Sequence, residues 1–580
     1  MSKRIVIIGG VAGGASAAAK ARRTSEDVEI VLIEAGPYIS FANCGLPYYV
    51  GGEIAERARL FVASPKLFAR RFNIDVRTLT RATSVDRAKK TVTVKRPDGA
   101  AETIAYDRLI LATGTVNIKP PIPGLDRPNV FTCRTVPDVD AIGACLAKLT
   151  PVESEIVETE VAAAAPRSAV VIGGGYIGLE SAEQLLRRKL KVTVVEMADQ
   201  LMLALDKEMS EPIRAALVKA GAEVVLGDGA KEIVEKDGRS ALVTKSGREI
   251  PFDVGILSVG VKPNAELAKA AGIAIGKTGA IQVDDAQRTS DASVFAAGDN
   301  SEAMHLVLGK PVSIPLAGPA NKAGRVAGAN AALDLAGAAG DDPRRLHFQG
   351  VVGTAVVRVC DVTAGVTGIT ESLARREGIA CEASYMHGLN HAGYFPGAEP
   401  LVMKLLYAPA DGRLLGAQVV GKDGVDKRID VLATAITARM NIEDLEQLDL
   451  CYAPPFASAK DLVVMGGFAG ANTRRGEMPA ITLNQLIEEL AGAHPPVLVD
   501  ARSVKEFAAG HVEGAINIPV DDLRERMGEV PAGRPVVIYC GVGYRAYVAQ
   551  RILMNRGRAD VRNLLGGWRL IQQARAFGAK

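Results

Sequence analysis

The sequence has few of the features that mark secreted, membrane or nucleic-acid-binding proteins. Its seven cysteines, an odd number scattered over 580 residues, do not resemble a secreted disulfide framework. No apolar run reaches the roughly 18 residues that a membrane span requires, and the apolar stretch after Met1 is too short for a signal peptide. The net charge of only +3 does not favour nucleic-acid binding. We therefore expect a protein of the reducing cytoplasm with no membrane or nucleic-acid partner.

Metal-binding patterns and aromatic residues are also scarce. No group of Cys or His residues has the spacing of a zinc or iron–sulfur site, so we expect no metal. Aromatic residues make up 4% of the chain, whereas glycine is abundant, with 60 residues. Abundant glycine fits backbone that closely approaches a bulky ligand, with a loop-rich architecture as the alternative. The composition, 48% hydrophobic and 23% charged, is that of a globular protein, and the length predicts three to four domains.

The same arrangement of strand, glycine turn, helix and strand occurs twice. Each first strand is a short apolar run rich in β-branched residues, which predicts a strand buried on both faces, as in a parallel sheet. The first copy comprises Arg4–Ile8, Ala15–Ala21 and Val28–Ile33, and the second comprises Ala169–Ile172, Tyr176–Leu186 and Lys191–Val195. Two such units predict two nucleotide-binding domains.

The second glycine turn matches the complete dinucleotide-binding pattern GxGxxG. Its glycine positions are Gly173, Gly175 and Gly178, so a pyrophosphate can lie on backbone N–H groups where the helix begins. Glu196 ends the following strand, where its carboxylate can accept a hydrogen bond from a ribose 2′-OH and would repel a 2′-phosphate. We therefore predict that this turn binds NAD(H) rather than NADP(H).

The first glycine turn departs from that pattern, because Val11 stands at the second glycine position. Glu34 nevertheless ends the next strand. The stretches that contain Thr113-Gly114 and Gly298-Asp299 resemble signatures of flavoprotein reductases with two dinucleotide-binding domains. The resemblance covers about residues 1–330 and implies that the first domain holds FAD, with Asp299 at the ribityl chain. The implied FAD contacts are Gly9, Val11, Ala12, Gly13, Gly14, Glu34, Thr113, Gly114, Gly298 and Asp299.

Cys44 is the cysteine of this flavoprotein segment. It stands in the sequence SFANCGLPYY, residues 40–49, without the second cysteine of a CxxxxC pair. A lone cysteine cannot store electrons as an internal disulfide, so its oxidised form must be a sulfenic acid or a mixed disulfide. Because Cys44 is expected to open a helix, we predict that the helix dipole favours its thiolate. The cysteines at 133, 145, 360, 381 and 451 lack such a context and are expected to be packing residues.

The segment around Cys44, together with His391–Gly397 and Tyr452–Phe456, resembles the coenzyme A disulfide reductases. The resemblance implies a homodimer in which Tyr394 and Tyr452 of one subunit donate hydrogen bonds in the active site of the other. The residues that it implies for coenzyme A binding are Ser16, Lys20, Arg23, Ser40, Asn43, Lys460, Arg71 and His305. A ligand with several phosphates also suits the cationic rim formed by Lys20, Arg22 and Arg23.

The C-terminal part resembles the rhodanese fold through Val497–Arg502 and Phe507–Pro519. Cys540 then follows an apolar strand and begins a short loop that ends at Arg545. The N–H groups of such a tight loop can cradle an anionic persulfide. We predict that the charge of Arg545 helps to keep Cys540 a thiolate. An inactive docking module is the alternative.

These patterns predict an α/β chain: a two-dinucleotide-binding-domain flavoprotein with an α+β dimerisation domain and a C-terminal rhodanese α/β domain. Residues 151–166 are expected to be a surface insertion, to which we assign no function. The expected domains are 1–118 and 250–330 for FAD binding, 119–249 for NAD binding, 331–470 for dimerisation, 471–478 as a linker and 479–580 for the rhodanese.

The whole chain except that insertion resembles coenzyme A disulfide reductase fused to a rhodanese, a family that includes NADH-dependent persulfide reductases. The resemblance implies that NADH reduces FAD, and that FAD reduces a coenzyme A persulfide, polysulfide or disulfide at Cys44. Cys540 would carry sulfur as a persulfide. The alternatives are a flavin NADH oxidase or peroxidase with a sulfenic acid at Cys44, and a sulfur carrier or redox sensor.

Overall fold

The computed structural model describes residues 3–149 and 167–576, so the expected insertion at 151–166 lies outside the described residues. The chain forms two compact units. The first comprises Met1–Leu201 and Leu217–Val351, and the second comprises Met202–Ala216 and Val352–Lys580. None of the helices in the described ranges is both long and apolar enough to cross a membrane.

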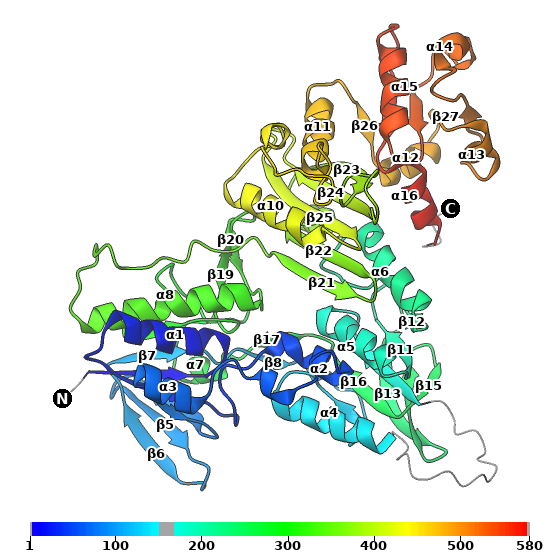
Figure 1. Cartoon of the computed structure of the whole chain (residues 1–580). Coiled ribbons are helices and arrows are strands. Elements are labelled where there is room, and N and C mark those ends of the chain that lie inside the picture. Colours follow the sequence, from blue (N-terminus) through cyan, green and yellow to red (C-terminus); the bar gives the residue numbers. More distant parts are fainter. Residues whose placement is uncertain (1–2, 150–166, 577–580) are drawn as a thin grey trace. The chain divides into compact units, whose positions relative to one another are not determined.

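A five-stranded parallel sheet organises the N-terminal part of the first unit (Figure 1). Its strand order is β18 (Val294–Ala296), β7 (Arg108–Leu111), β1 (Arg4–Ile8), β2 (Glu29–Ile33) and β3 (Asp75–Arg77). Ile5 and Ile7 of β1 pack against α1 (Ala12–Thr24), α3 (Pro65–Phe72) and α8 (Ala317–Leu335). Val6 and Ile8 pack on the other face, toward the antiparallel strands β4 (Arg81–Asp86), β5 (Thr91–Lys95) and β6 (Ala101–Ala105). The prediction that β1 is buried on both faces is confirmed.

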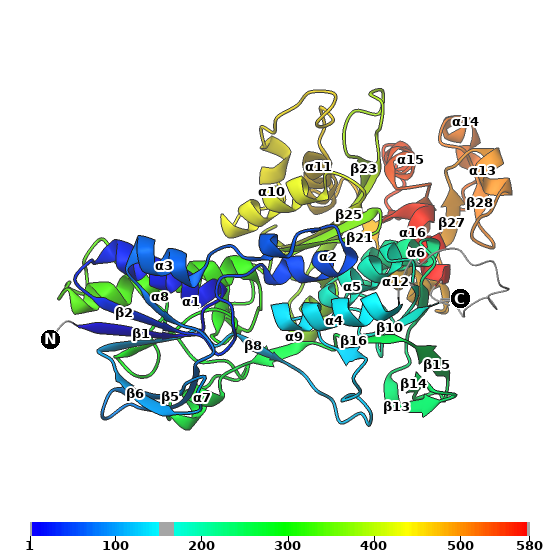
Figure 2. The same cartoon turned by 60° about the horizontal axis from the view of Figure 1, so that its bottom comes forward.

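The second βαβ motif forms a separate parallel sheet, which also belongs to the first compact unit (Figure 2). Its strand order is β12 (Glu223–Val225), β11 (Lys191–Val195), β10 (Ser168–Ile172), β16 (Val254–Leu257) and β9 (Val130–Phe131). The helix α5 (Tyr176–Arg187) follows β10, and α2 (Leu46–Gly51) packs against α5 and α4 (Val136–Leu149). The smaller elements of this unit are η1 (Asn43–Gly45), η2 (Arg57–Leu60), β8 (Thr115–Asn117), β13 (Ala230–Lys236), β14 (Arg239–Thr244), β15 (Glu249–Phe252), β17 (Val261–Pro263), α7 (Glu266–Ala270), β19 (Ala303–His305) and β20 (Lys310–Val312).

The second unit begins with a five-stranded antiparallel sheet. Its order is β21 (Ala355–Val359), β22 (Val362–Gly368), β25 (Leu414–Gly421), β24 (Pro400–Tyr407) and β23 (Glu382–Leu389). The helix α10 (Val425–Thr437) packs on β22 and β25, and α11 (Leu462–Arg474) packs on β23. The further elements of this part are α6 (Lys207–Lys219), which groups with this unit as far as Ala216, α9 (Glu371–Glu377) and η3 (Asp444–Gln447). An antiparallel sheet with helices packed on it is the α+β arrangement that the sequence predicts for the dimerisation domain.

The C-terminal residues form a parallel sheet with helices on both faces. The strand order is β26 (Ala480–Ile481), β30 (Val561–Leu564), β29 (Val536–Tyr539), β27 (Val497–Asp500) and β28 (Ile516–Asn517). The accompanying helices are α12 (Leu483–Leu490), α13 (Val504–Ala508), α14 (Leu523–Arg526), η4 (Met527–Glu529), α15 (Tyr544–Met554) and α16 (Gly567–Ala576). Val499 and Ile538 pack on one face of the sheet, whereas Leu498 and Val537 pack on the other.

Some predicted domain bounds differ from the structure. The bound at 250 is too early, because β16 pairs with β10 and therefore belongs to the second parallel sheet. The predicted linker 471–478 overlaps α11, which continues to Arg474. Residues 202–216 also group with the second unit, although they lie inside the predicted NAD-binding domain. These bounds depend on long-range strand pairing and packing, which local turn signals do not report.

Candidate active sites

Both glycine turns bring a helix close to the strand that precedes it. A Cβ atom at Gly14 would lie 1.7 Å from the carbonyl oxygen of Gly9, and one at Gly178 would lie 2.0 Å from that of Gly173. Because any side chain would collide with backbone there, both positions require glycine. The departure from the pattern at Val11 leaves this close approach unchanged.

The helices after these turns begin without a side-chain cap. Val11, before α1, and Gly175, before α5, offer no side-chain hydrogen bond, and neither first turn contains an acidic residue. The first N–H groups of a helix need an acceptor, and a pyrophosphate supplies one that also interacts favourably with the helix dipole. The two turns therefore fit one dinucleotide each.

Glu34 and Glu196 occupy equivalent places beside the two turns. Glu34 Oε2 accepts a hydrogen bond from Gly10 N at 2.7 Å, and Glu196 Oε2 accepts one from Gly174 N at 2.7 Å. The other oxygen of each carboxylate accepts from the backbone N–H two residues after the glutamate. In Glu34 the donor is the N–H at residue 36, at 2.6 Å, and in Glu196 it is the N–H at residue 198, at 2.8 Å. Both carboxylates are thus fixed at the carboxyl end of a parallel sheet, where the sequence predicts a ribose contact.

Asp299 brings a partly buried carboxyl group to the end of β18. Burial raises its pKa to about 6, and the positive charge of Arg134 opposes this only in part. No residue in the described ranges donates a hydrogen bond to this carboxyl group, which therefore fits a ligand hydroxyl such as those of a ribityl chain. The next residue, Asn300, donates to Thr113 Oγ1 at 3.0 Å, so the two predicted flavoprotein signatures lie together.

Cys44 lies in η1, directly before α2. Its segment is joined to the first glycine turn, because Ser40 N donates to Gly10 O at 2.9 Å. The cysteine is exposed, yet partial burial of the thiol, followed by the negative charges of Glu180 and Asp299, raises the pKa of Cys44. This direction is opposite to the predicted preference for the thiolate, because burial and then the two carboxylates act against the start of a helix of only six residues.

Ser16, Lys20 and Arg23 share one face of α1, beside α8. Ser16 Oγ donates to Asn321 Oδ1 on α8 at 2.6 Å. Burial and then the like charges of Arg325, also on α8, and Arg23 lower the pKa of Lys20. Like charges held so close suit a ligand with several phosphates. The sequence did not identify Asn321 or Arg325, because α8 carries no motif and lies far from α1 in the sequence.

The other residues predicted for coenzyme A binding are dispersed. Asn43 adjoins Cys44, and Arg71 lies in the last turn of α3. His305 is 3% exposed, and its Nδ1 accepts hydrogen bonds from Val307 N and Leu308 N. Burial also lowers the pKa of His305, so it offers little charge to a ligand. Lys460 belongs to the second unit.

Tyr394 and Tyr452 lie together in the second unit. Their hydroxyl oxygens are 2.7 Å apart, and the side chains are 76% and 47% exposed. The hydrogen bond between them raises the pKa of Tyr394. Two exposed aromatic side chains that share a hydrogen bond form a surface that can donate to a ligand from outside the unit.

Cys540 lies at the end of β29, in the loop before α15. The side chain is 1% exposed, and Gly543 N donates to its sulfur at 3.1 Å. Arg545 Nη1 and Nη2 each donate to a carboxylate oxygen of Glu506 at 2.7 Å, and this contact lowers the pKa of Glu506 to about 2. One N–H group of the loop therefore faces the sulfur. Arg545, which is predicted to support the thiolate, shares its charge with Glu506, a contact that the sequence did not indicate.

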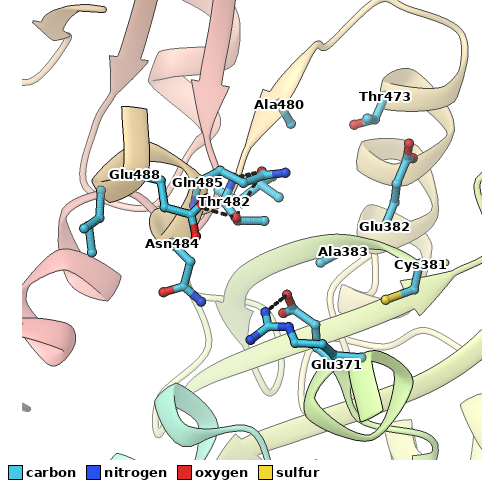
Figure 3. A pocket seen from close by; sticks show the side chains of 13 residues that line it. Glu371, Cys381, Glu382, Ala383, Thr473, Ala480, Thr482, Asn484, Gln485 and Glu488 are labelled. Carbon is cyan, nitrogen blue, oxygen red and sulfur yellow. Dashed lines mark hydrogen bonds and ion pairs between the residues drawn. The ribbon is translucent and has the colours of Figure 1, made fainter. Parts of the chain in front are cut away.

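A hollow of about 840 Å³ in the second unit contains none of the predicted site residues (Figure 3). Glu371, Cys381 and Glu382 line one side of it, and Thr482, Gln485 and Glu488 line the other. Its polar lining is mainly acidic and amide, and the cation among its lining residues, Arg375, is paired with Glu371, which does not suit a phosphate-bearing ligand. The hollow is therefore separate from the predicted chemistry.

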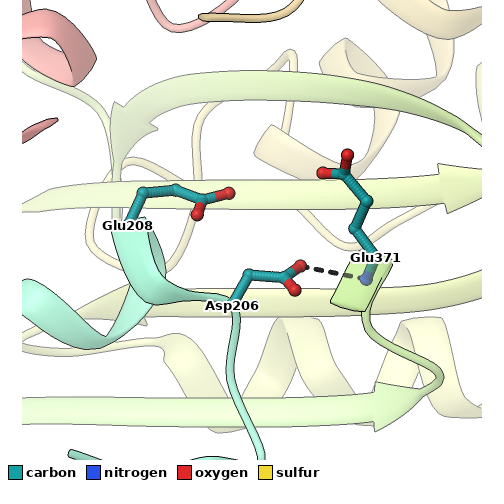
Figure 4. A group of neighbouring side chains, drawn as sticks. All are labelled: Asp206, Glu208 and Glu371. Atoms are coloured by element: carbon teal, nitrogen blue, oxygen red, sulfur yellow. Dashed lines mark hydrogen bonds between the residues drawn. The ribbon is translucent and has the colours of Figure 1, made fainter. Parts of the chain in front are cut away.

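A group of acidic side chains comprises Asp206, Glu208 and Glu371 (Figure 4). Lys404, which is 1% exposed, places its Nζ 2.8 Å, 2.6 Å and 2.7 Å from oxygens of these three carboxylates. The ammonium group already supplies the cation that the carboxylates require. The cluster is thus an ion-pair network that joins α6 and α9 to β24.

Comparisons with known proteins place this architecture. Residues 3–324 match the family model of pyridine nucleotide-disulphide oxidoreductases. The chain belongs to this family. Residues 354–463 match the dimerisation domain of the same oxidoreductases, and residues 482–574 match the rhodanese-like domain. The predicted fold class and the predicted resemblance are confirmed, and the cofactors of this oxidoreductase family are FAD and a nicotinamide dinucleotide.

Three relatives illustrate the likeness. Reduced CoADR-RHD of Bacillus anthracis is 40% identical, with a TM-score of 0.91, and the match covers 99% of this chain and 98% of that one. An NAD-dependent persulfide reductase from A. fulgidus is 38% identical, with a TM-score of 0.87, over 98% of this chain and 99% of that one. The NAD(P)H coenzyme A polysulfide/persulfide reductase of Pyrococcus horikoshii is 35% identical over 80% of this chain and 98% of its own length.

Proposed function

We propose that this oxidoreductase uses NADH to reduce coenzyme A persulfides, polysulfides or disulfides at Cys44. Cys540 moves sulfane sulfur as a persulfide in the same chain. FAD, when bound, supplies the two-electron link between the nicotinamide and the sulfur. The names of the relatives, which act on coenzyme A persulfides and polysulfides or on persulfides, support this substrate class.

The surroundings of Cys44 carry the proposal. All seven cysteines are free, so Cys44 has no internal disulfide partner. Asp299 contributes to its electrostatic environment, and Ser40 ties its segment to the turn that starts α1. The same helix carries Lys20 and Arg23 at its surface. Arg22, which the sequence predicts in the same cationic rim, is instead buried and donates to backbone carbonyl oxygens. Cys44 is thus a single thiol near both the glycine turn expected to bind FAD and the cations of α1. This arrangement suits an electron acceptor whose sulfur is attached to a phosphate-bearing molecule such as coenzyme A.

In this proposal Cys44 attacks the substrate sulfur, and Tyr394 and Tyr452 donate hydrogen bonds to the group that leaves. Because the pKa of Cys44 is raised, its proton must leave before the thiolate attacks the outer sulfur of the substrate. On a coenzyme A persulfide, this attack forms a persulfide on Cys44 and expels the coenzyme A thiolate. On a coenzyme A disulfide, attack forms a mixed disulfide and expels one coenzyme A thiolate. In both cases a hydrogen-bond donor stabilises the thiolate that leaves. Tyr394 and Tyr452 are suited to this task, and we propose that they act on the partner subunit of a homodimer.

The C-terminal site is suited to sulfur transfer without electron transfer. Cys540 has the Gly543 N–H beside its sulfur, and no flavin-type signature lies within residues 479–576. A persulfide on Cys540 would carry negative charge that this N–H and Arg545 can stabilise. We therefore assign sulfur extraction to Cys540 and reduction to Cys44.

The experiment that tests the proposal is steady-state NADH oxidation by the holoenzyme with different acceptors. Coenzyme A persulfide or disulfide should support much faster turnover than dioxygen or hydrogen peroxide. Cys44→Ser should retain FAD and its reduction by NADH yet lose turnover, whereas Cys145→Ser, a control without a motif, should be unchanged. Faster turnover with dioxygen or peroxide would establish the NADH oxidase or peroxidase alternative. Negligible turnover with every acceptor would favour the sulfur carrier or redox sensor.

A further inference from the structure

The two tyrosines project from segments that have no regular structure of their own. Tyr394 lies in the loop 390–399, between β23 and β24, and Tyr452 lies in the segment 448–461, between η3 and α11. Both side chains are exposed. A 2.7 Å contact between two exposed hydroxyl groups therefore depends on whatever fixes the backbone of these two segments.

Arg428, on α10, contacts the end of each segment. Its side chain is buried, and Nη2 donates to Asn390 O at 2.7 Å and to Asp461 Oδ2 at 2.7 Å. Asn390 starts the Tyr394 loop, and Asp461 ends the Tyr452 segment. Nη1 donates to Gly424 O at 3.0 Å, which fixes the guanidinium against its own helix start. One buried cation thus connects the two segments through a rigid helix.

The two partners of Arg428, Asn390 and Asp461, are themselves hydrogen-bonded to backbone N–H groups of, or next to, the segments that carry Tyr394 and Tyr452. Asn390 Oδ1 accepts hydrogen bonds from His391 N at 3.0 Å and Glu399 N at 2.8 Å, which closes the base of the Tyr394 loop. Asp461 Oδ1 accepts from Val463 N at 3.0 Å and so caps α11. A direct bond also joins the segments, because the N–H at residue 392 donates to the carbonyl oxygen at residue 454 at 3.3 Å.

We propose that Arg428 is the positioning residue for the Tyr394–Tyr452 hydroxyl pair. This inference rests on the proposed role of the tyrosines as hydrogen-bond donors in sulfur reduction. Lysine at this position would keep the charge near Asp461. Its side chain is shorter by about one bond, however, and it lacks the second nitrogen that holds Nη2 in place through Gly424 O. Its ammonium group would therefore not stay within hydrogen-bond distance of both Asn390 O and Asp461 Oδ2. The two segments would then move relative to each other, while α11 would keep its cap.

Arg428→Lys should lower kcat for coenzyme A disulfide by about tenfold to a hundredfold, as a misplacement of about 1 Å does. The KM for NADH and the rate of FAD reduction by NADH should not change. Since Arg428 acts through the tyrosines, Arg428→Lys should cost little further activity in a Tyr394→Phe background. Arg474→Lys, which alters the Arg474–Glu443 ion pair of the same unit, is the matched control and should leave kcat unchanged. Additive losses in the double variant would overturn the inference.

A second readout does not depend on activity. The hydrogen bond with Tyr452 raises the pKa of Tyr394, so loss of this bond in Arg428→Lys should lower that pKa. The titration of Tyr394 is obtained as the difference in tyrosinate absorbance between proteins with and without Tyr394→Phe. In the Arg428→Lys background this difference should appear at lower pH. An unchanged titration would overturn the inference. If Tyr394→Phe and Tyr452→Phe leave turnover intact, the proposed role of the tyrosines fails, whereas this titration still tests the positioning. If Arg428→Lys does not fold, Asp461→Asn retains the cap of α11 and should produce the same shift.

Discussion

Removal of Lys404 should destabilise the second unit strongly. Its Nζ lies within 2.8 Å of oxygens of Asp206, Glu208 and Glu371, and the side chain is 1% exposed. Loss of one partner of a buried pair leaves uncompensated charge and costs about 3–5 kcal/mol. Because the Glu208 and Glu371 side chains remain 22% and 26% exposed, we expect Lys404→Met to lie at the lower end, about 3 kcal/mol.

The pH dependence of this variant should be opposite in sign to that of the wild type. In the wild type, burial opposes ionisation of Asp206, but the charge of Lys404 and several hydrogen bonds lower its pKa. That contribution to stability is complete above the ordinary carboxyl pKa and is lost as pH falls below about 4. Without Lys404, desolvation and mutual repulsion should raise the carboxyl pKa values, so the folded state should bind a proton before the unfolded state does. The stability of Lys404→Met should therefore increase as pH falls from 7.5 to 5.5, by up to about 1.4 kcal/mol per pH unit.

Hydrogen exchange of peptides from α6 and β24 would measure the local free energy of opening at both pH values. Lys422→Met is the matched control, because Lys422 is 54% exposed and its contact with Glu399 is solvated. The control should show a much smaller loss and no gain on acidification. If Lys404→Met opened no more readily than Lys422→Met, or lost stability at pH 5.5, the account of the buried network would be refuted.

Three further predictions concern the reaction. Wild-type kcat/KM should be at least about tenfold higher with NADH than with NADPH. Glu196→Gln, which keeps an oxygen at this position but removes the charge, should lower the ratio of the two values. Equal wild-type values would contradict the prediction that the Glu196 carboxylate repels a 2′-phosphate. Mixed dimers of inactive Cys44→Ser with inactive Tyr394→Phe/Tyr452→Phe subunits should regain activity, because one site then holds all three groups, and no recovery in proven heterodimers would disprove action across the interface. Cys540→Ala should abolish sulfur transfer to cyanide but leave reduction of free coenzyme A persulfide largely intact. If Cys540→Ala lowered this reduction as severely as Cys44→Ser does, Cys540 would be required in the same catalytic cycle as Cys44.

The βαβ units could be predicted from the sequence because their signals are local. The apolar run Lys191–Val195 forms β11 with the predicted bounds, since a strand buried on both faces needs no polar alternation. Gly178 was identified because the helix must pass close to Gly173 O, a requirement that residue spacing records. The same holds for Cys540, whose strand, loop and helix are consecutive in the sequence.

The residues that the sequence did not identify act across long sequence separations. Arg325 affects Lys20 only because α8 packs on α1. Glu506 contacts Arg545 although it belongs to α13, a different helix. Asp461 and Arg428 show no motif, and their importance appears only when both segments meet at one guanidinium. Burial and pairing are properties of the packed chain, so local pattern reasoning does not detect them.

Cys44 shows how this limit changes a chemical conclusion. The local sequence correctly indicated a lone cysteine before a helix, and the helix dipole alone would favour its thiolate. Burial of the thiol, and then the negative charges of Glu180 on α5 and Asp299 after β18, instead raise its pKa. Because a raised pKa lowers the fraction of thiolate, Cys44 should react slowly as a free thiol at neutral pH. A cysteine held in this state avoids adventitious oxidation, so its reactivity should depend on what occupies the cationic face of α1 and the turn at Asp299.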